Sequence, residues 1–295
     1  MWVLLGVFVL LGGQPSEAGT GDHTQQTDRL GHDRARDYDE YVAIGDSFTA
    51  GSGIRPDDGS GCLRSGRDYP SRLAERLGAR LYDASCGGST TQQLETPQPT
   101  AGSTNPPQIT EVDRRTDLVT ISLGLNDTRF ATVLRTCQEV AWDDPQGSPC
   151  RTALETRGDS ILATLPEFGQ RLERVIRTVR RHGPNAEVVV VGYPQLAPES
   201  GTCADLPFAA GDYAYLAQYL VALNSVIEAA AYRAGVHFAD VLTASSGHDI
   251  CAGGDAWVLG ARPSPRTIVF HPFANEQRAI AALVEDVLQS EAGNR

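Results

Sequence analysis

Hydrophobic residues in this chain fall into two alternating patterns, short continuous runs and longer stretches with helical spacing. The continuous runs predict buried strands, and four consecutive valines in one of them are typical of a central parallel strand. These predicted strands span 41–44, 117–123, 187–191 and 236–241. The stretches with helical spacing span 69–77, 128–134, 152–182, 213–234 and 274–288. Strand and helix therefore alternate, which favours one parallel sheet with helices on both faces.

Proline and glycine divide these elements further. Within the helical stretch 152–182, Pro166 predicts a break or kink, and Gly183 followed by proline predicts its end. We expect two long loops to be cross-linked rather than disordered, because each contains cysteine, proline and glycine. These loops span 135–149 and 194–212. In open α/β sheets reactive groups gather beyond the carboxyl ends of the strands, so candidate chemistry is expected there.

The first residues follow a different pattern. Residues 1–11 form a short apolar run, and Ser16-Glu17-Ala18 fits a small-x-small cleavage site, which together predict a signal peptide over 1–18. The run carries no preceding positive charge and is shorter than the roughly 20 apolar residues that span a bilayer. Residues 19–39 are polar without periodicity and predict a flexible linker. The predicted folded domain therefore covers 40–292.

Acidic residues outnumber basic ones, 37 to 25, and give a net charge of −12. This balance argues against nucleic acid or an anionic membrane surface as the main partner, although it leaves a local basic patch open. A hydrophobic content of 41% is ordinary for a globular chain that buries a core.

The chain contains six cysteines, and an even number in an exported chain predicts a disulfide framework. Six cysteines allow many pairings, of which sequential pairing is the simplest, and sequence alone cannot select one. Metal binding is disfavoured, because there is no CxxC pair and no histidine at the short spacing of zinc sites.

Ser47 is a candidate nucleophile, since it lies in Gly45-Asp46-Ser47-Phe48 directly after a predicted strand. Rigid backbone would hold its hydroxyl at the open edge of the sheet, near the N-terminus of a helix. The alternative is that Ser47 only caps that helix. The α/β-hydrolase motif G-x-S-x-G does not match, because Thr49 occupies its last position.

Three further segments supply complementary chemistry. The amide of Gly88, in Cys86-Gly87-Gly88-Ser89, can approach a substrate oxygen because no Cβ intervenes. Asn126, in Gly124-Leu125-Asn126-Asp127, offers a side-chain NH₂, although this segment also reads as a turn. His271 precedes a predicted helix and can take a proton from Ser47. Together the segments predict a nucleophile, oxyanion donors and a base, which is the set that ester hydrolysis needs.

These segments, in this order, resemble the sequence blocks of the SGNH (GDSL-type) hydrolases. The sequence 44–51 resembles the nucleophile block, and Gly88, Asn126 and His271 lie in segments similar to the glycine, GxND and histidine blocks. The resemblance covers about residues 40–290. It is greatest to the secreted bacterial esterases and lipases that carry three sequential disulfides.

The resemblance implies a single three-layer α/β/α domain with a parallel five-stranded sheet, the flavodoxin-like SGNH hydrolase fold. It implies an acyl-enzyme on Ser47 with His271 as base, no cofactor and no metal. The oxyanion donors would be the amides of Ser47 and Gly88 and the side chain of Asn126. The implied disulfides are Cys62–Cys86, Cys137–Cys150 and Cys203–Cys251.

The family usually places an aspartate three residues before the histidine, and this chain has Ile268 there. In the resembling esterases a backbone carbonyl replaces the acid. We therefore predict a Ser47–His271 dyad in which the Ile268 carbonyl accepts the imidazole Nδ1–H. The alternative is that a distant carboxylate, Asp240 or Asp255, completes a triad.

The remaining histidines are weaker candidates for the base. His248 lies beside a cysteine and resembles a similarly placed family histidine, so it is interpreted as structural or site-lining. His237 falls within a predicted strand and is interpreted as structural. The others are expected to be solvated, and they are His23, His32 and His182.

The sequence thus predicts an exported, monomeric serine esterase or lipase that acts on a small-molecule or lipid ester without a stable membrane span. Acyl-lipid esters are favoured if several apolar side chains line an acyl pocket, but ordinary loop packing explains them equally well. These residues are Leu196, Pro198, Leu206, Pro207, Phe208 and Trp257. The alternatives are a carbohydrate O-acetyl esterase, an acyltransferase, and a non-catalytic binding module on the same scaffold.

Overall fold

A computed structural model describes residues 37–158, 160–198 and 200–292 of the chain. The predicted signal peptide, 1–18, and most of the predicted linker lie outside these residues. Tyr38, at the end of that linker, is buried and donates a hydrogen bond from its hydroxyl to Glu187 Oε2 at 2.9 Å. Packed structure therefore begins slightly before the predicted start of the domain.

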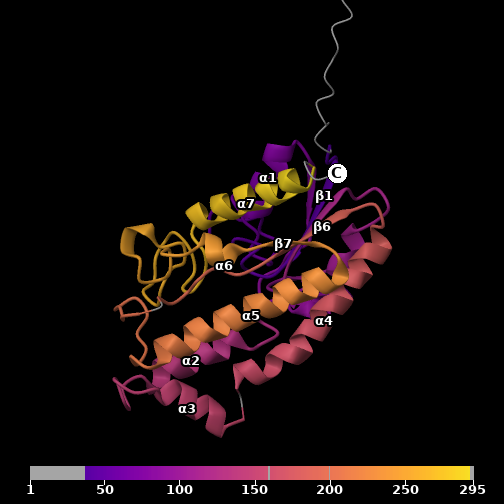
Figure 1. Ribbon diagram of the computed structural model, residues 1–295. Helices are drawn as coiled ribbons and strands as arrows, with labels where there is room; N and C mark the ends of the chain where they lie inside the picture. The colour runs from indigo at the N-terminus through magenta and orange to yellow at the C-terminus, as the bar shows by residue number, and fades with distance from the viewer. Residues whose placement is uncertain (1–36, 159, 199, 293–295) are drawn as a thin grey trace, which may run out of the picture. The chain divides into compact units, whose positions relative to one another are not determined.

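Five parallel strands form the central sheet in the order β2-β1-β5-β6-β7, with every neighbouring pair parallel (Figure 1). This order is the flavodoxin-like one, and the predicted fold class is confirmed. The strands are β1 (Glu40–Gly45), β2 (Arg80–Asp83), β5 (Leu118–Ser122), β6 (Glu187–Val191) and β7 (His237–Ala239). A separate antiparallel pair consists of β3 (Gln98–Thr100) and β4 (Ser103–Asn105).

The central strands β1, β5 and β6 are buried along almost their whole length, which explains their continuous hydrophobic runs. Strand β2 has no such run, because it lies at the sheet edge and is only partly buried. The hydrophobic pattern therefore detects the middle of the sheet and misses this edge strand.

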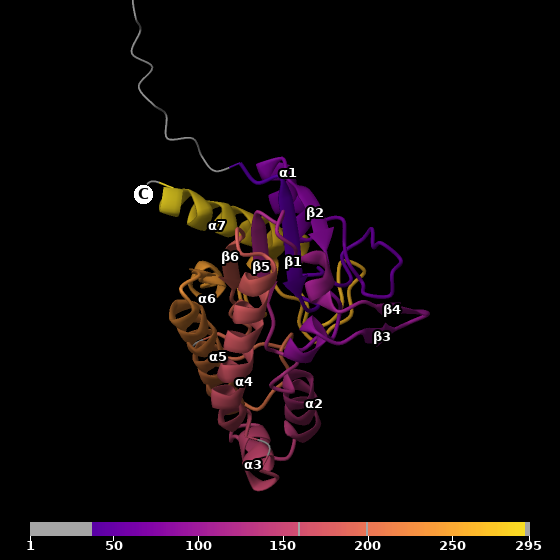
Figure 2. The ribbon, with the colours of Figure 1, turned by 90° about the vertical axis from the view of Figure 1, so that its right-hand side faces the viewer.

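Helices cover both faces of the sheet. Figures 1 and 2 show α1 (Tyr69–Leu77) and α7 (Ala274–Ala292) on one side, and α4 (Ile161–His182) and α5 (Asp212–Ala234) on the other. Helices α4 and α5 pack in one hydrophobic core with the side chains of Val42 and Ile44. Helices α1 and α7 pack in a second core with Tyr41 and Ala43, which point to the other face of the strand. The remaining helices are α2 (Phe130–Val140), α3 (Pro149–Thr156), α6 (Val241–Ala244) and the 3₁₀ turns η1 (Thr91–Leu94), η2 (Gln108–Glu111) and η3 (Gly253–Asp255).

The predicted break at Pro166 within 152–182 is wrong. The stretch divides instead between α3 and α4, where Gly158 adopts a φ of +70° that no helix tolerates. Pro166 lies inside α4, in its second turn. Its missing N–H removes one hydrogen bond near the helix start, which the packed helix tolerates.

Three disulfides join loops that lead away from the sheet. Cys62–Cys86 connects the loops after β1 and β2, Cys137–Cys150 connects α2 to α3, and Cys203–Cys251 connects the loop before α5 to the segment before η3. This is the sequential pairing that the resemblance implies. Among the described residues no helix is long and apolar enough to cross a membrane.

Candidate active site

Ser47 lies just beyond the carboxyl end of β1, next to the centre of the sheet. The backbone turns sharply there, because the Ala50 amide donates to the Asp46 carbonyl at 2.9 Å and the Ser52 amide to the Ser47 carbonyl at 3.1 Å. This segment is a series of turns and not a helix, and the next helix begins at Tyr69. The expected helix N-terminus at Ser47 is therefore absent, and tight turns hold the serine instead.

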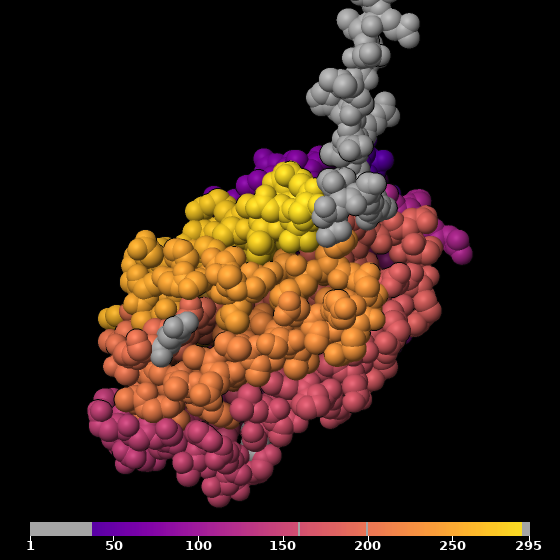
Figure 3. Space-filling view, viewed as in Figure 1, coloured from indigo at the N-terminus to yellow at the C-terminus, as the bar shows by residue number. Residues whose placement is uncertain are grey.

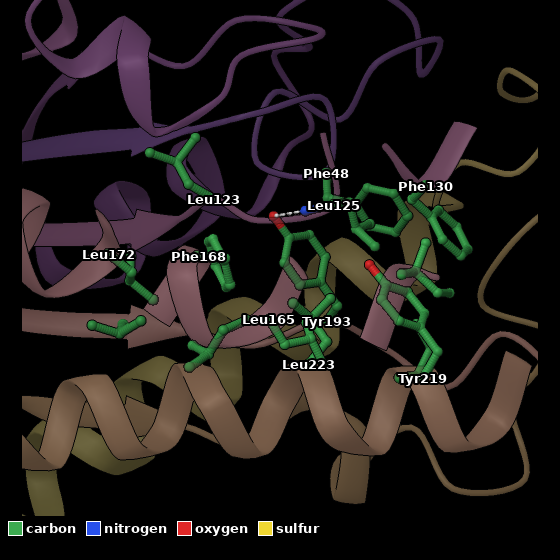
Figure 4. Close-up of a cluster of buried hydrophobic side chains, with 14 of the residues drawn as sticks. Phe48, Leu123, Leu125, Phe130, Leu165, Phe168, Leu172, Tyr193, Tyr219 and Leu223 are labelled. Carbon is green, nitrogen blue, oxygen red and sulfur yellow. Dashed lines mark hydrogen bonds between the residues drawn. The ribbon is translucent and has the colours of Figure 1, made fainter. Parts of the chain in front are cut away.

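The buried carboxyl group of Asp46 holds this turn in place through two hydrogen bonds. Its Oδ1 accepts a hydrogen bond from the Phe48 amide at 2.9 Å, and its Oδ2 accepts one from the Tyr193 hydroxyl at 2.6 Å. Burial raises the pKa of Asp46 to about 7, against the lowering effect of these hydrogen bonds. Figure 4 shows the Tyr193 hydroxyl also meeting the Leu125 amide, at 3.5 Å. Tyr193 thus links the serine turn to the segment that carries Asn126.

Gln108 connects the nucleophile strand to the glycine loop. Its Oε1 accepts from the Gly45 amide at 2.8 Å, while its Nε2 donates to the Gly45 carbonyl at 3.0 Å and to Ser89 Oγ at 2.9 Å. The side chain is buried, so each of these bonds replaces water that the site excludes. The sequence offered no signal for Gln108, because it belongs to none of the four segments.

Gly88 and Asn126 are brought together by Ser89. Asn126 donates from Nδ2 to the Ser89 carbonyl at 2.9 Å, which leaves the second hydrogen of that amide for another acceptor. Gly88 has a φ of +81° and is exposed, and a Cβ built on it would meet nothing nearer than 3.8 Å. The positive φ therefore favours glycine here, and the missing Cβ lets a ligand approach the Gly88 amide from the solvent side. Neighbouring protein atoms would not exclude a side chain.

The Cys62–Cys86 disulfide and nearby backbone bonds hold this loop beside β1. The Cys86 amide donates to the Gly45 carbonyl at 3.1 Å, and the Gly87 amide donates to the Cys62 carbonyl at 2.9 Å. The glycine loop, the serine turn and Asn126 thus converge at the carboxyl edge of the sheet, as the order of the segments predicts.

Asp127 supports the segment that carries Asn126. Its carboxylate accepts from the Thr91 amide at 2.9 Å and from Thr91 Oγ1 at 2.5 Å, and Arg171 Nε lies 3.5 Å away. Burial raises the pKa of Asp127, and these partners oppose that rise. The aspartate therefore fixes the start of η1 next to Asn126.

His271 ends a four-residue turn whose carbonyls determine how its ring is held. The His271 amide donates to the Ile268 carbonyl at 3.1 Å, and the ring Nδ1 lies 2.9 Å from the Val269 carbonyl. The prediction that Ile268 holds the imidazole is therefore wrong in its residue, although a backbone carbonyl does occupy that role. The cause is the positive φ of Phe270, +59°, in a turn whose closing bond already uses the Ile268 carbonyl.

The environment of His271 favours a neutral imidazole. Burial lowers its pKa below the ordinary value of 6.5, and the hydrogen bond to Val269 opposes this only in part. A carbonyl can only accept, so Nδ1 carries the hydrogen and Nε2 is left with a free lone pair. The ring stacks on Phe48 with centroids 5.7 Å apart, which places His271 beside the residue that follows Ser47.

The partner of His271 Nδ1 is the Val269 carbonyl and neither of the two alternative acids. Asp240 caps α6 by accepting from the Thr243 amide at 3.0 Å, and the backbone carbonyl of Asp255 lies 2.7 Å from His248 Nδ1. His248 also stacks on Trp257 with centroids 4.6 Å apart, which fits its interpretation as structural or site-lining.

The remaining candidates from the sequence are a histidine and the apolar residues proposed to line an acyl pocket. His237 Nε2 lies 3.2 Å from Glu187 Oε1, as a structural histidine would. Leu196, Leu206 and Phe208 are buried in the main core, so the structure favours loop packing over an acyl pocket for them. In the part of the chain that the structure describes, no group of three histidine, cysteine or carboxylate side chains is arranged to hold a metal.

This chain is similar to known proteins over most of its length. Residues 43–278 match the GDSL-like Lipase/Acylhydrolase family. Lipase 2 of Streptomyces coelicolor is 34% identical over 259 residues, which cover 84% of this chain and 85% of that protein. The lipase of Streptomyces rimosus is 33% identical over 242 residues, which cover 81% of this chain and 82% of that protein.

Solved structures show the same relationship. Phospholipase A1 from Streptomyces albidoflavus aligns with a TM-score of 0.72 at 28% identity and covers 85% of this chain and 99% of that one. The extracellular lipase from Streptomyces rimosus aligns with a TM-score of 0.70 at 28% identity and covers 84% of this chain and 99% of that one. Both relatives are matched over almost their entire length.

Proposed function

Because the chain belongs to the GDSL-like lipase/acylhydrolase family and is a carboxylic ester hydrolase, we propose that Ser47 and His271 act as a catalytic dyad. The observation that carries this proposal is the hydrogen bond between His271 Nδ1 and the Val269 carbonyl. It selects the tautomer whose Nε2 can accept a proton from serine. The lowered pKa of His271 keeps that nitrogen unprotonated at neutral pH.

In the proposed reaction, Ser47 Oγ attacks the ester carbonyl carbon while His271 Nε2 takes the hydroxyl proton. The negative charge that develops on the substrate oxygen is accepted by the amides of Ser47 and Gly88 and by the Asn126 side chain. The tetrahedral intermediate collapses to an acyl-enzyme, and the imidazolium returns its proton to the departing alcohol. His271 then takes a proton from water, which attacks the acyl group, and the imidazolium returns that proton to Ser47 Oγ as the bond to serine breaks and the acid is released.

The Val269 carbonyl supports this cycle differently from a carboxylate. It orients the ring and its dipole favours the imidazolium, but it carries no full charge. The backbone supplies it, so no single side-chain substitution removes the acceptor. This arrangement leaves most of the stabilisation of the transition state to the oxyanion donors.

The substrate proposed is an acyl-lipid ester, and the protein is proposed to be exported. Three disulfides are characteristic of oxidising compartments, and the predicted signal peptide agrees with them. The relatives are named lipases, a phospholipase A1 and, in one case, an extracellular lipase, which supports both proposals by analogy. A monomer is proposed because nothing in the site needs a second copy.

Labelling with a fluorophosphonate probe tests the nucleophile. The wild-type protein should be labelled at Ser47, and Ser47→Ala should lose the label and at least about 10⁴-fold in kcat, as expected for the loss of a serine nucleophile. Ser200→Ala, which changes an exposed loop serine, is the matched control. A folded wild-type protein that takes no label would contradict the proposal and favour a non-catalytic binding module.

Product analysis tests the substrate class. We expect p-nitrophenyl esters of medium and long acyl chains to be hydrolysed faster than the acetate, with free fatty acid as product. A strong preference for acetate would point to carbohydrate esters, and transfer of the acyl group to added glycerol in place of water would identify an acyltransferase.

A further inference from the structure

A cavity of about 420 Å³ lies beside the segment that carries the catalytic histidine. Phe273, Ala274 and Asn275 form part of its wall and directly follow His271 and Pro272 in the chain. Four arginines also line it, and they come from two distant parts of the sequence. They are Arg55, Arg67, Arg266 and Arg278.

The positive charge of this cavity is largely uncompensated. The residues that line it, all of them in the described part of the chain, include no aspartate or glutamate. Arg55 pairs with Asp57 at 3.2 Å, and the Arg266 guanidinium lies 4.2 Å from the centre of the Phe273 ring. Among the described residues, no carboxylate lies within ion-pair distance of Arg67 or Arg278.

Neighbouring titratable groups compensate this charge only in part. The pKa of Arg72 is lowered chiefly by burial and also by repulsion from Arg278 and Arg67, while Asp68 and Glu75 act in the opposite direction. The nearby carboxyl groups of Glu276 and Asp68 have pKa values raised to about 8, chiefly by burial, so they are mostly uncharged at neutral pH. Helix α7 begins at Ala274 in the cavity wall and adds the positive end of its dipole.

A second cavity, of about 410 Å³, is also lined by four arginines, and carboxylates compensate their charge in part. There Arg171 lies 2.7 Å from Glu167, and Arg177 lies 3.3 Å from Glu173. Glu95 also lines that cavity. Two of the four arginines of that cavity therefore have carboxylate partners and a glutamate lies in its wall, whereas the lining of the cavity beside His271 contains no carboxylate.

The cavity also adjoins both catalytic segments. Its wall begins two residues after His271, a span of at most about 7 Å along the chain. Ile54, which also lines the cavity, follows the turns after Ser47, and Thr267 Oγ1 donates to the Ser52 carbonyl at 3.1 Å to join the two segments. Figure 3 shows the surface of residues 245–273 bordering that of α7. One substrate molecule is therefore long enough to place an anionic group in this cavity and its ester group at Ser47.

We propose that this cavity is a subsite for the phosphate group of the ester substrate, with Arg67 and Arg278 as its ligands. The inference rests on the proposed ester hydrolysis and narrows the substrate to an ester whose alcohol part carries a phosphate, as in a glycerophospholipid. Guanidinium groups bind phosphate oxygens through paired, charge-assisted hydrogen bonds, which gives both affinity and orientation. In such a lipid the glycerol unit separates the phosphate from the scissile ester by only a few bonds. This short separation fits a cavity that adjoins the segments of Ser47 and His271.

The test compares two lipids with the same acyl chains, dioctanoyl phosphatidylglycerol and dioctanoylglycerol. The wild-type protein should show a higher kcat/KM on the phosphorylated lipid. The ratio of the two values should fall by about tenfold in Arg67→Gln and again in Arg278→Gln, chiefly through KM, because each loses a charge-assisted bond. Arg114→Gln, an exposed arginine before β5 at the other end of the sheet, changes the net charge equally and should leave the ratio unchanged.

Two further measurements separate the possible anions. Glycerol 3-phosphate should bind to Ser47→Ala in calorimetry and bind more weakly when Arg67 and Arg278 are both glutamine. If inorganic phosphate binds at this cavity but the lipid ratio does not depend on the two arginines, the site takes free phosphate and the headgroup proposal is wrong. An unchanged ratio in folded variants without any phosphate binding overturns it as well.

The failure of this inference can be told from failure of the proposed function. If the wild-type protein hydrolyses neither lipid, the ratio has no value and the proposed function fails. The calorimetric measurement still tests the subsite in that case, because binding of glycerol 3-phosphate does not require turnover.

Discussion

The proposed nucleophile and the proposed base are held by two different kinds of structure. Ser47 follows a central strand, and buried polar side chains, Gln108 and Asp46, fix the backbone on either side of it. His271 lies in a long irregular segment between α6 and α7, where regular structure is limited to η3. The sheet therefore positions the serine, whereas local backbone contacts and a covalent cross-link position the histidine.

The segment that carries His271 lacks a strand or long helix and is held instead by backbone hydrogen bonds within itself. The Leu259 amide donates to the His271 carbonyl at 3.0 Å, and the Phe273 amide donates to the Trp257 carbonyl at 2.7 Å. Cys251, bonded to Cys203, anchors the start of the segment. These contacts are local, so the base side should loosen more readily than the nucleophile side when a single constraint is removed.

Gln277 joins the two sides. From α7, just after the histidine, its Nε2 donates to the Phe48 carbonyl at 2.9 Å and its Oε1 accepts from the Tyr69 amide at 2.6 Å. A side chain that follows the base thus bonds to the backbone beside the nucleophile. The comparison teaches that a buried side-chain amide is one of the bonds that align the rigid half of the proposed dyad with its cross-linked half.

The largest effect should come from removing the cross-link on the base side. Cys203→Ala together with Cys251→Ala should cost about 4 kcal/mol of unfolding free energy by the loop-entropy estimate, and kcat should fall with it. Removing Cys137–Cys150 in the same way should cost about 3 kcal/mol but spare kcat while the protein remains folded. Denaturant unfolding and kinetics below the transition measure both. Equal losses of kcat in the two variants would contradict the assignment of the base side to the cross-link.

Gln108→Ala should weaken the nucleophile side. It leaves the amide and carbonyl of Gly45 without their side-chain partner, so we expect about 2–4 kcal/mol of lost stability and a lower kcat. The matched control is Gln92→Ala, because Gln92 is exposed and its side chain makes no hydrogen bond in the described structure. A Gln108→Ala protein with wild-type stability and kcat would show that the sheet alone holds the serine.

A smaller, pH-dependent effect is expected at Glu276, the neighbour of Gln277. Burial raises the pKa of Glu276 from 4.5 to about 8, so ionisation is disfavoured in the folded protein and stability falls as the pH rises through that interval. Glu276→Gln removes the ionisation and should raise Tm relative to wild type at pH 9 more than at pH 5. A constant difference in Tm across this range would mean that Glu276 does not titrate as the structure indicates.

The smallest effect expected is a shift in the pH profile. Because burial lowers the pKa of His271, kcat/KM for a neutral ester should reach half its maximum at a pH below 6.5. Phe48→Leu opens one face of the ring to solvent and should move this midpoint upward. A wild-type midpoint above 6.5 would indicate that a charged partner, and not the Val269 carbonyl, faces the imidazole.

Much of the site could be predicted from the sequence because its signals are local. The four segments each lie within a few residues, and their order places them at strand ends that a parallel sheet brings together. Helix α1 shows the same principle, since Asp68 caps its start and Gly78 ends it in a left-handed conformation. Short-range chemistry of this kind is visible in one sequence.

The details of the histidine turn could not be predicted in the same way. The choice of Val269 over Ile268 depends on the positive φ of Phe270, and no glycine or asparagine announces that conformation. Packing against the rest of the fold imposes it. The sequence therefore predicts a backbone acceptor but cannot identify which carbonyl points at the ring.

By itself, then, the sequence determined the alternating strands and helices, the chemical groups of the site and the order in which the sheet presents them. Only the tertiary structure decided what supports those groups, from Gln108 and Gln277 to the cavity that joins Arg67 with Arg278. The physical reason is the range of the interactions. Hydrophobic periodicity and turn chemistry act over a few residues. Gln108 bonds to a residue more than sixty positions away, and the partners of Gln277 and the two cavity arginines are separated by more than two hundred positions.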